Sequence, residues 1–179
     1  MKKFLLILLV PVSIFATEYE YSSEDCNTTS PTNRLNVWMP EYSNYITLHY
    51  FSTQGWAGWT QTFGQLSNFQ EELRNDYGYE NVVIIAVGKS NLSGFNSNFC
   101  ANSDLPLVMD EAFDYPIREQ FYPYSTHKRL AILGHEGELI GNITLNSGLN
   151  NSAKNYILGI IEENYEQTLS GDINGDNIL

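Results

Sequence analysis

The two cysteines, Cys26 and Cys100, are the first candidates for covalent or redox chemistry in this sequence. They lie far apart, and neither belongs to a Cys-x-x-Cys pair, the spacing in which one thiol resolves the mixed disulfide formed by the other. In an oxidising compartment, two distant cysteines form a structural disulfide more often than a reactive couple. The sequence leaves two alternatives open: a Cys26–Cys100 bridge, or free thiols with Cys100 acting as a lone redox group.

The three histidines, His49, His127 and His135, do not follow a metal-binding pattern. No His-x-His or His-Glu-x-x-His spacing occurs, so a metal site built on histidine is not expected. The glycine motifs that hold phosphates and the Gly-x-Ser-x-Gly elbow are also missing from the sequence. The carboxylates form no recognisable acid–base pair, so no familiar catalytic signature points to an enzyme.

A short acidic motif near residue 179 has the spacing of a calcium loop. Asp172, Asn174 and Asp176 occupy positions one, three and five of an EF-hand loop, where their oxygens would bind a hard cation. The run resembles the opening of a dockerin repeat, Asp-x-Asn-x-Asp-Gly, with Asn177 at the usual glycine. The sequence ends at loop position eight, before the ligands at positions nine and twelve, so we expect little or no calcium binding by the segment as it stands. A complete repeat in a longer parent protein would imply a calcium-binding anchor; otherwise the segment is an acidic tail.

The first sixteen residues have the pattern of a secretory signal peptide. Two lysines precede an apolar run at residues 4–10, and the segment closes on a small residue, Ala16. The run is much shorter than the ~20 residues that a spanning helix needs, and no cysteine near Ala16 would carry a lipid. We predict cleavage after Ala16 and a secreted or periplasmic protein of bacterial type.

The net charge restricts the partners of the exported chain. Removal of residues 1–16 takes away two lysines and no acid, so the net charge falls from −12 to −14. Such a surface repels phosphate backbones and anionic lipid, which excludes nucleic acid and, after signal cleavage, membranes as partners. About 160 residues suit one domain with a proper core.

Hydrophobic periodicity predicts strands and helices in alternation after a polar lead-in at residues 17–34. The continuous apolar run at residues 82–87 is typical of a strand buried on both faces of a parallel sheet. Strand, helix and strand over residues 46–87 predict a right-handed βαβ unit. The full expectation is strands near 35–39, 46–51, 82–87, 129–133 and 138–143, helices near 63–77, 113–122 and 153–165, a polar loop at 88–103 and a short apolar piece at 105–109.

Four segments in this order resemble landmarks of a known superfamily. They are residues 51–59 (Phe-Ser-Thr-Gln-Gly-Trp-Ala-Gly-Trp), the buried run at 81–88, the Pro-Leu-Val-Met-Asp segment at 106–110 and the late strand and turn at 130–137. The chain resembles the thioredoxin-like superfamily, above all its exported redoxins and the N-terminal domain of selenoprotein P. The resemblance covers residues 35–166, with a tail at 167–179. It implies a three-layer α/β fold in which helices flank a mixed central sheet.

The residues at the superfamily's redox positions are not cysteines here. Trp56 and Trp59 stand where the resemblance places the Cys-x-x-Cys pair, and an indole cannot exchange disulfides. Thr53 matches the threonine of the peroxiredoxin Thr-x-x-Cys motif, but its cysteine position is again Trp56. Lys128, or a neighbour, occupies the place of the family's cis-proline. The resemblance therefore implies a degenerate redox site.

The tryptophan loop suggests what such a site would do instead. Trp56 and Trp59 follow a strand at the edge where open α/β sheets bind ligands, so exposed indoles would stack on a sugar or grip a peptide. The alternative is that they fold back and fill the vacated site. We predict a non-catalytic binding or adaptor module for a protein, peptide or glycan, with no cofactor in the domain. The competing hypothesis is a thiol-dependent oxidoreductase that uses Cys100 or an unrecognised site.

Overall fold

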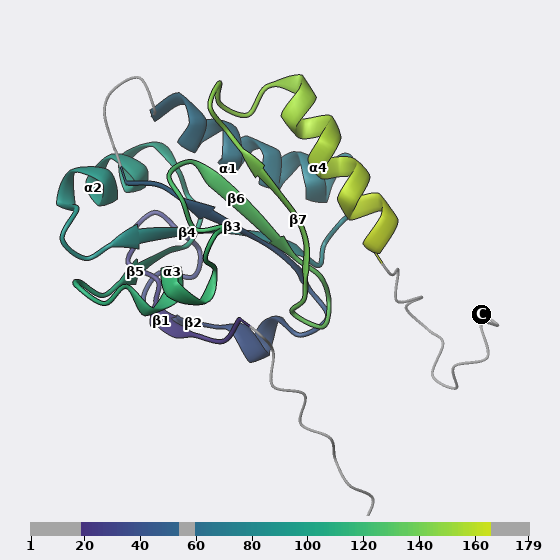
Figure 1. Ribbon diagram of the computed structural model, residues 1–179. Coiled ribbons are helices and arrows are strands. Elements are labelled where there is room, and N and C mark those ends of the chain that lie inside the picture. The colour runs from purple at the N-terminus through teal and green to yellow at the C-terminus, as the bar shows by residue number, and fades with distance from the viewer. Residues whose placement is uncertain (1–18, 54–59, 166–179) are drawn as a thin grey trace, which may run out of the picture.

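A five-stranded mixed sheet forms the centre of the protein in a computed structural model that describes residues 19–53 and 60–165 (Figure 1). The strand order is β5-β4-β3-β6-β7. β3, β4 and β5 are parallel, whereas β6 and β7 run antiparallel to their neighbours. The bounds are β3 (Ile46–Phe51), β4 (Val82–Lys89), β5 (Leu107–Asp110), β6 (Arg129–Leu133) and β7 (Leu139–Thr144). The predicted three-layer α/β fold with a mixed sheet is confirmed.

Three helices cover one face of the sheet: α1 (Thr60–Asn75), α2 (Ser93–Asn102) and α4 (Asn151–Asn164). α1 buries apolar side chains spaced three or four residues apart, among them Phe63, Leu66, Phe69 and Leu73. They pack on alternate residues of the strands, including Leu48 and Tyr50 of β3 and Ile84 of β4. The helices predicted near 63–77 and 153–165 are therefore present, and their apolar stripes form the core of this face.

The opposite face is covered by the N-terminal part of the chain and a short helix. β1 (Ser22–Glu24) pairs with β2 (Asn36–Trp38), followed by the 3-10 helix η1 (Met39–Tyr42), and α3 (Pro116–Gln120) lies between β5 and β6 in the chain. Tyr19 and Tyr21 are buried in this second core with Phe51, Ile85 and Phe121. The segment at 17–34 was expected to be a loop-like lead-in, but its described residues contribute a strand and core aromatics.

Buried polar side chains explain why this N-terminal segment packs. The Asp25 carboxylate accepts hydrogen bonds from the Asn27 and Leu107 N–H groups, both at 2.9 Å. The Asn27 amide donates to the carbonyl oxygens of Ser103 and Leu105 at 2.7 and 2.8 Å. Three of these four bonds satisfy backbone groups about 80 residues away in sequence, which no local pattern reveals.

Two other elements differ from the sequence expectation. The loop expected at 88–103 contains α2, which buries only Phe95 and Phe99 and so has a weak helical signature. The helix expected at 113–122 is reduced to α3, because Tyr115 has a left-handed backbone conformation (φ 48°, ψ 57°) and Pro116 starts the helix.

Several predicted features lie outside the described residues. These are the signal peptide at 1–16, the loop residues Trp56 and Trp59, and the calcium-loop residues Asp172, Asn174 and Asp176. Within residues 19–53 and 60–165, no helix is long and apolar enough to cross a membrane.

Candidate binding site

A pocket of about 690 Å³ opens where the parallel strands end. β3 ends at Phe51, β4 at Lys89 and β5 at Asp110, and the register pairs Lys89 with Asp110. Ligand sites of open α/β sheets lie at this edge. The lining residues are Thr53, Lys89, Asp114, Tyr115, Arg118, Glu119, Tyr122, Ser125, Thr126 and His127.

Arg118 joins the elements that surround this pocket. Its side chain is 7 % exposed, and its two terminal nitrogens donate to the carbonyl oxygens of Ser52 (3.0 Å), Val87 (2.8 Å) and Ser125 (2.9 Å). The guanidinium thus ties the ends of β3 and β4 to the loop that precedes β6. Burial lowers the pKa of Arg118 to about 10, against the opposing effect of Asp110, so the side chain is charged at neutral pH.

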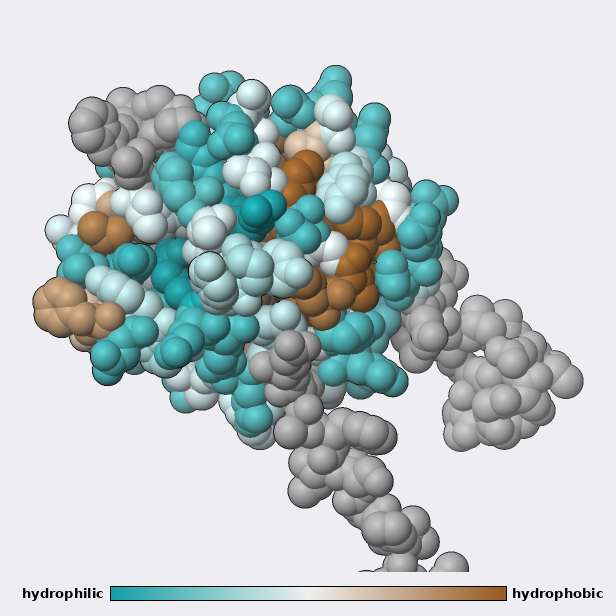
Figure 2. Space-filling model, in the orientation of Figure 1, coloured by the Kyte–Doolittle hydropathy of each residue, from teal (hydrophilic) through white to brown (hydrophobic). Residues whose placement is uncertain are grey.

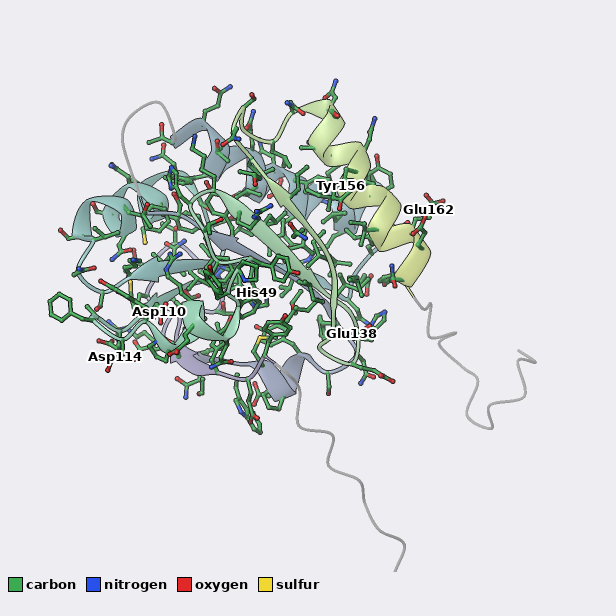
Figure 3. All side chains as sticks on the ribbon, viewed as in Figure 1. His49, Asp110, Asp114, Glu138, Tyr156 and Glu162 are labelled. Atoms are coloured by element: carbon green, nitrogen blue, oxygen red, sulfur yellow. The ribbon has the colours of Figure 1, made fainter. Side chains whose placement is uncertain are left out.

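Asp110 fixes α3 beside the sheet. One carboxylate oxygen accepts the Ile117 N–H at 2.9 Å, and the other accepts the Arg118 N–H at 3.0 Å and lies 3.7 Å from the Arg118 Nε. Burial raises the pKa of Asp110, while the two N–H donors and the Arg118 charge act in the opposite direction. Figure 3 shows Asp110 close to α3, with Asp114 farther toward the outside.

Thr53 and His127 form the junction between β3 and the loop before β6. The His127 Nδ1 lies 3.3 Å from the Thr53 N, 3.2 Å from the Thr53 Oγ1 and 3.4 Å from the Ser52 Oγ. A backbone N–H can only donate, so Nδ1 accepts and the neutral ring carries its hydrogen on Nε2. Burial, followed by the charges of Lys128 and Arg118, lowers the pKa of His127.

Aromatic rings stand at the rim of the pocket. The Lys89 Nζ lies 3.9 Å from the centre of the Tyr115 ring, a cation–π contact. Tyr122 lines the pocket and is 76 % exposed. Phe113, two residues before Tyr115 in the chain, is 84 % exposed. Large rings so open to solvent are available for stacking on a ligand.

Comparison with known proteins identifies the architecture. No family model matches the chain, and a search of curated proteins finds no match. Among solved structures, the thiol:disulfide interchange protein DsbE from Chlorobium tepidum aligns with a TM-score of 0.59 at 12% identity, over 84% of this chain and 96% of that one. The chain has a thioredoxin-like fold.

Two further structures support this thioredoxin-like assignment. A secreted Mycobacterium tuberculosis disulfide oxidoreductase, described as homologous to E. coli DsbE, aligns with a TM-score of 0.57 at 9% identity, over 82% of this chain and 97% of that one. The thioredoxin domain of a thiol-disulfide oxidoreductase from Bacteroides vulgatus gives a TM-score of 0.57 at 10% identity, over 82% and 96% of the two chains. At these identities the likeness concerns the fold.

The thioredoxin-like chain brings together some of the residues that the sequence singled out. Thr53 lines the pocket, and Lys128 is buried immediately before β6 with a φ of 61°. The cis peptide bond Tyr122–Pro123 lies in the same loop. Trp56 and Trp59 lie outside the described residues, so their part in the site stays a prediction.

The two cysteines lie apart from the pocket lining, beside β5 and α2. The Cys26 N–H donates to the Leu107 carbonyl at 2.8 Å, and the Thr29 hydroxyl lies 3.3 Å from the Cys100 carbonyl oxygen. Both thiols are free, with Cys26 exposed and Cys100 partly buried, so the bridge is not formed in the structure. Burial and nearby acids, including Asp25, raise the pKa of both thiols, and the Cys26 thiol contributes to the rise at Cys100.

Sequence reasoning did not find Lys89, Tyr115, Arg118 or His127. Lys89 was predictable, because it closely follows the buried run at 82–87 at the ligand-binding edge of the sheet. Arg118 was not predictable, since the helix expected at 113–122 gave no reason for its side chain to be buried. Within the described residues, no group of three or more His, Cys, Asp or Glu side chains could hold a metal ion.

Proposed function

We propose that this chain is an exported thioredoxin-like binding or adaptor module without thiol redox chemistry, and that the pocket at the ends of β3, β4 and β5 holds its ligand. The observation that carries the proposal is the chemistry of the described pocket lining. It provides hydroxyl groups, cations and aromatic rings, but no thiol. Aromatic rings beside polar groups suit a peptide or a glycan.

The sequence supports the loss of redox chemistry at this site. Trp56 and Trp59 stand at the cysteine positions implied by the likeness to exported redoxins and selenoprotein P, and Lys128 stands at or beside the cis-proline position. Disulfide exchange requires a thiolate, and the raised pKa values of Cys26 and Cys100 keep both thiols protonated near neutral pH. Neither thiol has the activated character that the competing oxidoreductase hypothesis needs.

The signal-peptide pattern supports action in the periplasm or outside the cell, and one of the similar structures is described as a secreted protein. The proposed module needs no cofactor. A complete repeat after Asp172, Asn174 and Asp176 in a longer parent protein would add a calcium-dependent anchor. The acidic surface leaves proteins, peptides and glycans as partners rather than nucleic acid or membranes.

Binding measurements on the exported chain test this proposal. A panel of short acetylated peptides and of neutral and acidic oligosaccharides is titrated and followed by calorimetry. Tyr122→Ala should weaken binding of a hit about tenfold, the effect of losing ~1.4 kcal/mol of stacking. Tyr77→Ala is the matched control, because Tyr77 is also exposed but follows the end of α1 and does not line the pocket.

Activity assays separate the binding module from the oxidoreductase. We expect neither insulin reduction nor peroxide turnover above buffer. Turnover that disappears in Cys100→Ser would contradict the proposal and establish the thiol-dependent alternative. Equal binding by the parent chain and Tyr122→Ala would argue against this pocket as the ligand site.

A further inference from the structure

Positive charge gathers around the pocket even though the protein is acidic. The net charge is −12 with nine lysines and arginines, yet Lys89, Arg118, Lys128 and Arg129 all lie in or beside the pocket. Arg129 belongs to this group because the register pairs it with Phe51, the last residue of β3. Figure 2 shows hydrophilic residues over the surface around α3, whereas hydrophobic residues gather over β7. The fold thus concentrates scarce cations at one place.

Three of these cations, Lys89, Arg118 and Arg129, are only partly compensated by acids among the described residues. Asp110 pairs with Arg118, and Arg129 donates to the neutral amide oxygen of Asn142 at 2.9 Å. Among residues 19–53 and 60–165, Lys89 forms no ion pair and contacts the Tyr115 ring instead. The Nε atoms of Arg118 and Arg129 are buried and have no hydrogen-bond acceptor in this part of the chain. These buried atoms lie out of reach of a ligand, whereas the Lys89 ammonium lines the pocket without an ion pair among the described residues and so favours an acceptor with negative charge.

The positive charges around the pocket also affect the pKa values of their neighbours. Burial, followed by the charges of Lys128 and Arg118, lowers the pKa of His127. Burial, followed by the Arg118 charge, lowers the pKa of Lys89, against the opposing effect of Asp110. An anion in the pocket would relieve this repulsion between like charges. The hydroxyl group of Thr126 adds a neutral donor to the lining.

We propose that the pocket recognises a single carboxylate group of its ligand, with Lys89 as the main charged contact and the Thr126 hydroxyl as a further donor. This inference rests on the proposed binding function and names the ligand chemistry. The rim carboxylates of Asp114 and Glu119 repel ligands with several negative charges, so a polyphosphate or a polyanion fits poorly. Tyr115 and Tyr122 would pack on the uncharged body that carries the carboxylate.

The same chemistry occurs in a uronic acid and in an acidic peptide, and matched ligand pairs distinguish the two sources. One pair is a neutral oligosaccharide that ends in a single uronic acid and the same oligosaccharide ending in the corresponding hexose; the other is an acetylated peptide whose only acid is its free C-terminal carboxylate and its C-terminal amide. We expect one acid to bind at least tenfold more tightly than its neutral partner, with an affinity that falls as salt rises. Whichever pair shows this preference identifies the source of the carboxylate.

Variants assign the preference to Lys89. Lys89→Met should remove the acid-over-neutral preference, and Lys89→Arg should retain it. Lys154→Met is the matched control, because Lys154 also lies over an aromatic ring, that of Phe69, but on the helical face away from the pocket. Thermal unfolding checks that each variant is folded.

The outcomes also separate this inference from the proposed function. Binding that needs Tyr122 but treats acid and neutral partners alike would overturn the carboxylate inference and leave the binding function standing. Absence of binding by every probe would overturn both. An acid preference that survives in Lys89→Met would refute the role of Lys89.

Discussion

The helical face and the opposite face of the sheet are held by different interactions. α1, α2 and α4 cover the first face through a continuous apolar core, in which Leu66, Phe69 and Ile157 are fully buried. The second face carries apolar residues too, but its core also encloses His49, and Asp25 and Arg118 bind the segments that cover it. One face is therefore held mainly by area removed from water, the other also by a few specific polar contacts.

The two kinds of interaction differ in how strictly they fix the positions of the segments that they join. Apolar packing is non-directional and tolerates small shifts, whereas a buried hydrogen bond requires a particular partner at a particular distance. The polar contacts of Arg118 and Asp110 lie beside the candidate pocket, where they fix its walls. The candidate pocket therefore lies beside the face whose covering segments are held by these polar contacts. Substitutions at the polar contacts should destabilise this face first.

The largest effect is expected from removing the charge of Arg118. Arg118→Met leaves the Asp110 carboxylate buried without its ion pair and three carbonyl oxygens without their donor. The free energy of unfolding should fall by about 3–5 kcal/mol, as measured by urea denaturation. The double variant Asp110→Asn/Arg118→Met should recover part of the loss. A loss below about 1 kcal/mol would show that these contacts do not hold the second face.

The next largest effect on stability is expected from a disulfide between Cys26 of the N-terminal segment and Cys100 of α2. Oxidised glutathione should convert Cys26 and Cys100 into a disulfide, with its own disulfide reduced to two thiols. The bridge would join the N-terminal segment to α2 and raise the free energy of unfolding by about 2–4 kcal/mol. Mass spectrometry of alkylated protein counts the remaining thiols, and Cys100→Ser should show no stabilisation. Two free thiols after treatment would exclude the bridge.

His49 should make the second face sensitive to acid. Its ring is fully buried, its Nε2 lies 3.0 Å from the Tyr21 hydroxyl, and burial lowers its pKa to about 3. The unfolded chain takes up a proton near pH 6.5, whereas the folded chain does so only near pH 3. Stability is therefore present above pH 6.5 and is lost as the pH falls toward 3.

The pH dependence can be measured against a variant that cannot titrate. The difference in free energy of unfolding between the parent chain and His49→Phe should change by about 2 kcal/mol between pH 6 and pH 4, to the disadvantage of the parent chain. Denaturant titrations at a series of pH values give this difference. Parallel curves for the two proteins would mean that His49 is accessible to protons in the folded state.

The smallest effect is expected on the helical face, at the start of α4. The Asn150 side chain accepts the Ala153 N–H at 3.0 Å and caps the helix. Asn150→Ala should lower the free energy of unfolding by about 1 kcal/mol. The exposed neighbour provides the control, since Asn151→Ala should change stability by less than about 0.5 kcal/mol. Equal effects would mean that the Asn150 side chain does not stabilise the helix as its cap.

Elements with a local signal were predictable from the residues alone. The stripe of Phe63, Leu66, Phe69 and Leu73 indicated α1, and the run at 82–87 indicated a strand buried on both faces, because period and apolar content follow from burial alone. The resemblance to the thioredoxin-like superfamily, based on the order of these elements and their landmark segments, implied the mixed sheet. The edge of the parallel strands was the expected place for a ligand, and Thr53 does line the pocket there.

The cover of the second face and the walls of the pocket depend on contacts between residues that are distant in sequence. Asp25 and Asn27 have the residue types of a loop, but their side chains form hydrogen bonds with backbone groups at residues 103–107. Only the fold brings these groups near. Arg118 similarly serves carbonyl oxygens at the ends of β3 and β4. A polar side chain can be buried only where its partners converge, and partners distant in sequence leave no periodic trace. The apolar face was therefore predictable, and the polar site was not.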